Sequence, residues 1–126
     1  MDPSIRRRVR NRADSRCEYC GLAEEDSYIP HHIEHIRPKQ HGGGDSLSNL
    51  ALACQACNLK KGPNLAGIDP QSETMVALFN PRQQSWEEHF IRRGDFIMGL
   101  TPTGRATAQV LDMNARERVK IRQDLR

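Results

Sequence analysis

The stretch that decides the fold runs from Pro30 to Gly62 and reads PHHIEHIRPKQHGGGDSLSNLALACQACNLKKG. Its first part is a short apolar segment that carries a glutamate and a histidine side by side, Glu34 and His35. A loop follows, because three consecutive glycines close to a proline cannot hold a regular element. An isolated asparagine, an apolar run and a Cys-x-x-Cys pair come next. This order predicts a strand, a long loop, a second strand and a helix.

Sequence signals set the limits of these elements. Tyr28 to Ile36 carries a tyrosine and several isoleucines, and it predicts a strand that bends at Pro30. Leu50 to Ala53 is a short apolar run that predicts the second strand of a hairpin. A helix then opens at Cys54 and ends at Gly62, because glycine just beyond a helix, followed by proline, stops it.

An upstream cysteine pair completes a metal-binding pattern. Cys17 and Cys20 are separated by 33 residues from Cys54 and Cys57, which gives the spacing C-x2-C-x33-C-x2-C. Four thiolates at two such spacings fit a closed tetrahedral zinc site. The alternative is two redox dithiols, but neither pair has the surroundings of a thiol oxidoreductase. Because cysteine fills all four positions, we expect a structural zinc ion with no open site for water.

Composition supports the need for this metal. The chain has 126 residues, of which 37% are hydrophobic and 5% aromatic, so we expect one domain, residues 1–126, with a small core. Zinc binding contributes on the order of 10 kcal/mol to the folding of such domains. The N-terminus lacks the apolar segment of a signal peptide, and no run is long enough for a membrane span. We therefore expect a cytoplasmic protein without a membrane partner.

The first 14 residues form a basic element. Asp2 before Pro3 predicts a helix start, and the spacing of Ile5, Val9 and Ala13 predicts a helix with one apolar stripe. Arginines cover its other faces: Arg6, Arg7, Arg8, Arg10 and Arg12. Such a patch favours a polyanionic partner, and the alternative is a solvated helix face.

Residues 63–126 form a C-terminal extension with weaker signals. The sequence predicts strands and helices both in residues 1–62 and in this extension, so the expected fold class is α+β. The expected elements are a strand Met75–Phe79, a short helix Ser85–His89, a hairpin of Phe90–Arg93 with Phe96–Leu100, and helices Arg105–Met113 and Ala115–Leu125.

The central residues resemble a known family. Glu34-His35-Ile36, the glycine-rich loop, Asn49-Leu50 and the run Cys54-x-x-Cys57-Asn58-x-x-Lys61-Gly62 are similar to the HNH endonucleases. The flanking cysteine pairs resemble the zinc-knuckle variant of that family. The resemblance implies a ββα-metal core, also called a His-Me finger, over residues 15–62. It also implies cleavage of DNA, with RNA not excluded.

The resemblance assigns roles to the motif positions. His35 is the expected general base, which suits an imidazole because it titrates near neutral pH. Asn49 is the expected structural member that bridges the hairpin connection and helps to orient His35. Glu34 and Asn58 are expected to hold one catalytic cation, and their oxygen ligands favour Mg²⁺ or Mn²⁺. That cation would stabilise the leaving 3′ oxygen.

Strand geometry adds a condition to these roles. Adjacent residues of a flat strand face opposite sides, so Glu34 and His35 serve one site only if the strand twists, ends or bulges there. His32 shares the strand face of Glu34 and is a further candidate metal ligand, with a packing or solvated histidine as the alternative.

Several basic residues are candidates for phosphate contacts. Arg37, Lys60 and Lys61 flank the motif, although lysines at a helix end are also favoured by the helix dipole. In the basic helix the candidates are Arg6, Arg7 and Arg10. The competing function is a zinc-stabilised module that binds nucleic acid without cutting it. Both a monomer and a homodimer remain open.

Overall fold

The structure is a computed structural model that describes all 126 residues, and it contains the predicted hairpin. Strand β1 (His32–His35) pairs antiparallel with β2 (Leu50–Ala53). The register is continuous, with His32 opposite Ala53 and His35 opposite Leu50, so no bulge interrupts the ladder.

β1 is shorter than the predicted strand Tyr28–Ile36. The backbone groups of His31 are bonded to side chains, since its N–H donates to Glu24 at 2.8 Å and its carbonyl accepts from Arg10 at 2.9 Å. Pro30 has no N–H to donate. At this end of the strand, side chains therefore take the place of β2 as partners of the His31 backbone.

The chain divides into two compact units. The first unit comprises Met1–Pro63 and Asn80–Gln83. It contains helices α1 (Pro3–Arg12) and α2 (Gln55–Lys61) as well as the hairpin. Three short 3-10 turns complete it: η1 (Glu24–Asp26), η2 (Lys39–His41) and η3 (Leu47–Asn49).

Helix α1 confirms the prediction from its apolar stripe. Asp2 caps it by accepting from the Ser4 N–H at 2.9 Å, and Pro3 begins it. Ile5, Val9 and Ala13 pack against a small core that includes Leu50 and Leu52 of β2 and Ile33 of β1. The hydrophobic contacts thus hold α1 on one face of the hairpin.

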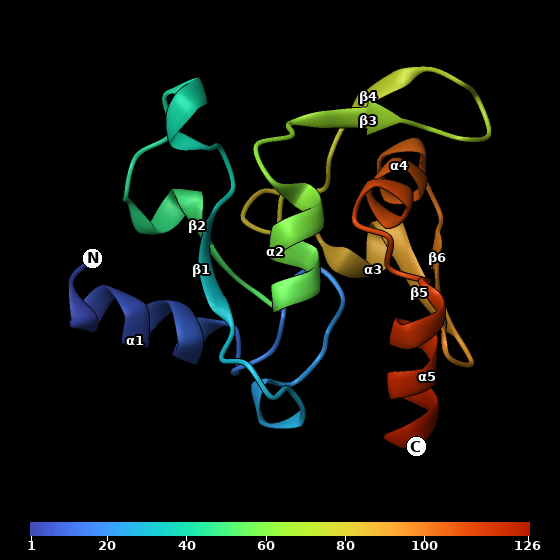
Figure 1. Cartoon of the computed structure of the whole chain (residues 1–126). Helices are drawn as coiled ribbons and strands as arrows, with labels where there is room; N and C mark the ends of the chain where they lie inside the picture. Colours follow the sequence, from blue (N-terminus) through green and yellow to red (C-terminus); the bar gives the residue numbers. More distant parts are fainter. The chain divides into compact units, whose positions relative to one another are not determined.

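Helix α2 lies on the other face (Figure 1). Strand residues alternate between faces, so Ile33 points toward α1 and Glu34 points toward α2, where it contacts Lys61. His35 is the last residue of β1, and its side chain contacts Asp45 of the loop that follows. The structure has no bulge here, so the condition for one site that it meets is the end of the strand at His35.

The second unit comprises Asn64–Phe79 and Gln84–Arg126. Its two hairpins pair β3 (Ala66–Ile68) with β4 (Met75–Ala77), and β5 (Phe90–Arg93) with β6 (Phe96–Gly99). Its helices are α3 (Trp86–His89), α4 (Pro102–Val110) and α5 (Arg116–Asp124). The second hairpin and the three helices were predicted, with shifted ends.

Two features of this unit were not predicted. Strand β3 is only three residues long, and its Gly67 allows close packing, because a Cβ there would lie 2.6 Å from Val110. Helix α4 starts earlier than predicted, since Thr101 caps it by accepting from the Gly104 N–H at 3.0 Å. The apolar core includes Phe90, on which Trp86 stacks with ring centroids 5.1 Å apart. No helix in the chain combines the length and the apolar character that a membrane crossing needs.

Candidate active site and metal centre

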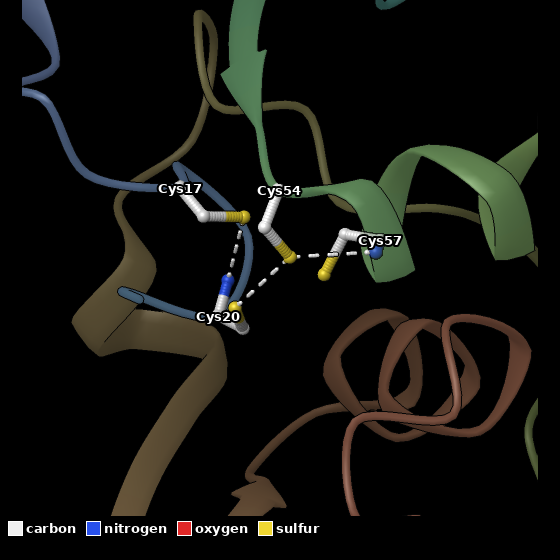
Figure 2. A group of neighbouring side chains, drawn as sticks. All are labelled: Cys17, Cys20, Cys54 and Cys57. Carbon is white, nitrogen blue, oxygen red and sulfur yellow. Dashed lines mark hydrogen bonds between the residues drawn. The ribbon is translucent and has the colours of Figure 1, made fainter. Parts of the chain in front are cut away.

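The four cysteines gather at one point of the first unit (Figure 2). All four side chains are buried, and their sulfur atoms lie within 4.8 Å of one another. Cys20 Sγ is 3.7 Å from Cys54 Sγ. A tetrahedron with Zn–S bonds of 2.3 Å has edges of about 3.8 Å, so this spacing fits a zinc ion.

The two cysteine pairs form the same local structure. The N–H of Cys20 points at Cys17 Sγ, and the N–H of Cys57 points at Cys54 Sγ, each at 3.5 Å. Cys54 is at the same time the N-cap of α2. Burial raises the pKa of the Cys17 thiol, so the thiolate form needs a cation beside it. The donor set therefore fits a structural zinc that joins the 17–20 turn to the start of α2.

A second contact holds the 17–20 turn to the hairpin. Glu18 accepts from the N–H of Leu52 at 2.8 Å and forms an ion pair with Arg82. Arg82 belongs to Asn80–Gln83, the later segment that is part of this unit. Neither side chain stood out in the sequence, because this contact joins positions that are far apart in the chain.

Glu34 lies in a buried cluster on the α2 side of the hairpin. One carboxylate oxygen accepts from the Tyr19 hydroxyl at 2.7 Å, and the other lies 2.7 Å from Lys61 Nζ. Glu34 is 5% exposed and Lys61 is 2% exposed. Lys61 also donates to the carbonyl of Ile36 at 2.9 Å. Burial raises the pKa of Glu34, and the ammonium of Lys61 opposes that shift.

This cluster restricts metal binding at Glu34. A carboxylate and an amide are the right donors for Mg²⁺ or Mn²⁺, which bind oxygen at about 2.1 Å. The ammonium of Lys61 already occupies the position next to the free oxygen of Glu34. A divalent cation at this oxygen must therefore compete with the ammonium of Lys61.

His35 has a different neighbour, which sequence reasoning missed. Its Nε2 lies 2.7 Å from Oδ1 of Asp45, at the end of the glycine-rich loop. The His35 side chain is 22% exposed and that of Asp45 is 57% exposed. The hydrogen bond from His35 holds the pKa of the Asp45 carboxyl below its ordinary value. The only sequence signal was a carboxylate beside a run of glycines.

Asn49 bridges the hairpin connection, as a donor and acceptor at once. Its Oδ1 accepts from the N–H of Arg37 at 2.9 Å, and its Nδ2 donates to the carbonyls of Arg37 and Gly44 at 3.0 and 2.9 Å. Its own carbonyl accepts from the N–H of Ile36 at 2.9 Å. The side chain thus joins the two ends of the loop that follows His35.

Asn58 and His32 are both half-buried. Asn58 follows Cys57 in α2. His32 lies on the Glu34 face, but its Nε2 contacts Gln55 Oε1 at 2.5 Å. The structure thus brings His32 to α2 and not to the Glu34 carboxylate.

The basic candidates fall into two groups. Arg10 forms an ion pair with Glu24 at 3.2 Å, and Lys61 is buried against Glu34. Both were expected to contact phosphates, but in the structure their charged groups contact protein. The others are exposed to solvent: Arg6, Arg7, Arg37 and Lys60. Arg37 also donates to the carbonyl of His41 at 2.6 Å.

Comparison with protein families matches residues 17–64 to the family described as HNH endonuclease. The matched residues include both strands of the hairpin, α2 and all four cysteines. This part of the chain belongs to the HNH endonuclease family. Its four-cysteine cluster and ββα core make it a zinc-knuckle form of the HNH domain. Searches of curated proteins and of solved structures gave no match.

Proposed function

We propose that this protein is a DNA endonuclease that hydrolyses phosphodiester bonds with His35 as the general base. The observation that carries the proposal is the position of His35 in the HNH domain. It stands at the end of β1, partly open to solvent, next to a loop that Asn49 ties together. An imidazole in such a place can accept a proton from an attacking water molecule.

The proposal includes a divalent cation at Asn58 and Glu34. Asn58 offers a half-buried amide oxygen, and Glu34 offers a carboxylate once Lys61 has moved away from it. A bound Mg²⁺ or Mn²⁺ would supply charge stabilisation for the leaving oxygen of the cleaved bond. The structural zinc would keep Asn58 in place, because Asn58 directly follows a zinc ligand.

Exposed basic side chains support nucleic acid as the substrate. Arg6 and Arg7 are exposed on α1, and Lys60 is exposed at the end of α2. Their charge would attract the phosphate backbone without reading its sequence.

A plasmid assay tests the proposal. Zinc-loaded protein is incubated with supercoiled DNA and added Mg²⁺ or Mn²⁺, and the nicked and linear forms are measured over time. Loss of a general base lowers the rate by about 10² to 10⁴, so His35→Ala should be nearly inactive. His41→Ala is the matched control, because His41 is exposed in the adjacent loop and should leave the rate unchanged.

Three outcomes separate the possibilities. Cleavage by wild type and His41→Ala but not by His35→Ala supports the proposal. Equal cleavage by His35→Ala contradicts the role of His35. If the wild type binds DNA in a gel-shift assay but cuts with neither cation, the protein is a binding module instead.

A further inference from the structure

We propose that Asp45 is a positioning residue for His35: it holds the Nε2–H tautomer, so that Nδ1 is the nitrogen that takes the proton from water. The inference rests on the proposed function and deepens it. It adds a residue that neither the motif nor the family match assigns.

The hydrogen bond fixes which nitrogen carries the proton. Asp45 Oδ1 lies 2.7 Å from His35 Nε2, and a carboxylate can only accept. The neutral ring has one N–H, so that proton must be on Nε2. Nδ1 then keeps its lone pair and can accept a proton. His35 is partly exposed, so water can approach this nitrogen.

Asp45 remains charged under the conditions in which a histidine base works. The hydrogen bond from His35 and the nearby Lys39 ammonium, at 3.9 Å, both lower the pKa of Asp45. A charged carboxylate also stabilises the imidazolium that forms when His35 accepts a proton. This is the orienting role that a carboxylate has beside a histidine base in hydrolases.

The glycine-rich loop positions the Asp45 carboxylate next to His35. Asn49 binds the carbonyls of Arg37 and Gly44, which fixes the residue just before Asp45. Gly43 is required for the close approach, since a Cβ there would lie 1.6 Å from the carbonyl oxygen of Arg37. Asn49 therefore orients His35 through the loop and Asp45, without a side-chain contact of its own to the ring.

The His35–Asp45 pair contributes little to the stability of the fold. Asp45 is 57% exposed, and exposed ion pairs contribute little to folding. Substituting Asp45 should therefore leave the fold intact, and a change in activity can be attributed to the state of His35.

The first test is spectroscopic and needs no cleavage. Protein labelled with ¹⁵N in histidine is studied by long-range ¹H–¹⁵N correlation, which distinguishes a protonated from an unprotonated ring nitrogen. His35→Ala identifies the signals. The wild type should show Nε2–H and bare Nδ1. Asp45→Asn should shift the ring toward Nδ1–H, because the amide can donate to Nε2. Asp26→Asn, an exposed aspartate of the same unit, should change nothing.

The second test is cleavage of plasmid DNA by the same variants. Asp45→Asn should lose at least about tenfold in rate, as expected when a base is held in the wrong tautomer. Asp45→Ala should lose less, because nothing then favours the wrong tautomer, and Asp45→Glu should recover part of the rate. Thermal unfolding should be the same for all of these variants.

A wild-type ring with Nδ1–H, or an Asp45→Asn variant with the wild-type rate, would overturn the inference. An inactive wild type whose ring shows Nε2–H only when Asp45 is present would contradict the proposed function, while the assigned tautomer would stand.

Discussion

Replacing Lys61 by methionine tests the buried cluster at the centre of the HNH domain. Methionine has a similar length but no charge, so Glu34 loses the ammonium at 2.7 Å and Ile36 loses a donor at 2.9 Å. Both members of the pair are almost fully buried, at 5% and 2% exposure. Removing one partner of such a pair costs about 3 to 5 kcal/mol. The total free energy of unfolding of a domain of this size is about 5 to 15 kcal/mol.

The assay is equilibrium unfolding in urea of the zinc-loaded protein. Lys61→Met should lower the free energy of unfolding by about 3 to 5 kcal/mol. The double variant Glu34→Gln with Lys61→Met should recover a large part of the loss, because no charge is then buried alone. Lys60→Met is the matched control, and an exposed position should change stability by less than about 0.5 kcal/mol.

The effect should also depend on pH in a defined direction. Burial raises the pKa of Glu34, and removal of the opposing ammonium raises it further. A carboxyl with a raised pKa destabilises the fold once it is ionised, so the deficit of Lys61→Met should grow as pH rises. A loss below about 1 kcal/mol, or a double variant whose loss equals the sum of the two single losses, would refute the reasoning.

Two further predictions concern the zinc centre and the second unit. Cys54→Ser should leave the HNH domain unfolded by circular dichroism and without zinc by metal analysis, because zinc binding contributes about 10 kcal/mol or more; a folded variant with full zinc content would contradict the four-cysteine site. Asp69 is buried and bound to Arg105 at 2.8 and 2.9 Å, which holds the pKa of its carboxyl well below the ordinary 3.8. Its contribution to stability is therefore complete above that pH and is lost as the pH falls through and below it. Thermal unfolding at a series of acidic pH values should show a smaller acid-side loss for Asp69→Asn than for wild type, and equal losses would count against the role of this pair.

The elements that were predicted correctly depend on contacts between near neighbours. Helix α1 follows from a cap, a proline and a regular apolar spacing, and α2 follows from Cys54 at one end and Gly62 at the other. The hairpin β5–β6 also has its turn and both strands in one short segment. In contrast, β3 is three residues long and gives too short a pattern to recognise.

The candidate site divides in the same way. The cysteine spacing and the positions of His35, Asn49 and Asn58 were visible in the chain, because the motif lies within a few tens of residues. The sequence placed Lys61 near phosphate, as expected for a lysine at a helix end. Its burial against Glu34 depends on how α2 packs on the hairpin, which no local pattern records.

The sequence by itself thus determined the four-cysteine pattern, the ββα order and the positions of the HNH motif. Only the tertiary structure decided which groups these residues face. In the regular β1–β2 ladder, Glu34 contacts Tyr19 and Lys61, whereas His35 contacts Asp45. The two neighbours differ because alternate strand positions point to opposite faces. The partners on each face come from distant parts of the chain, so packing, and not spacing in the sequence, selects them.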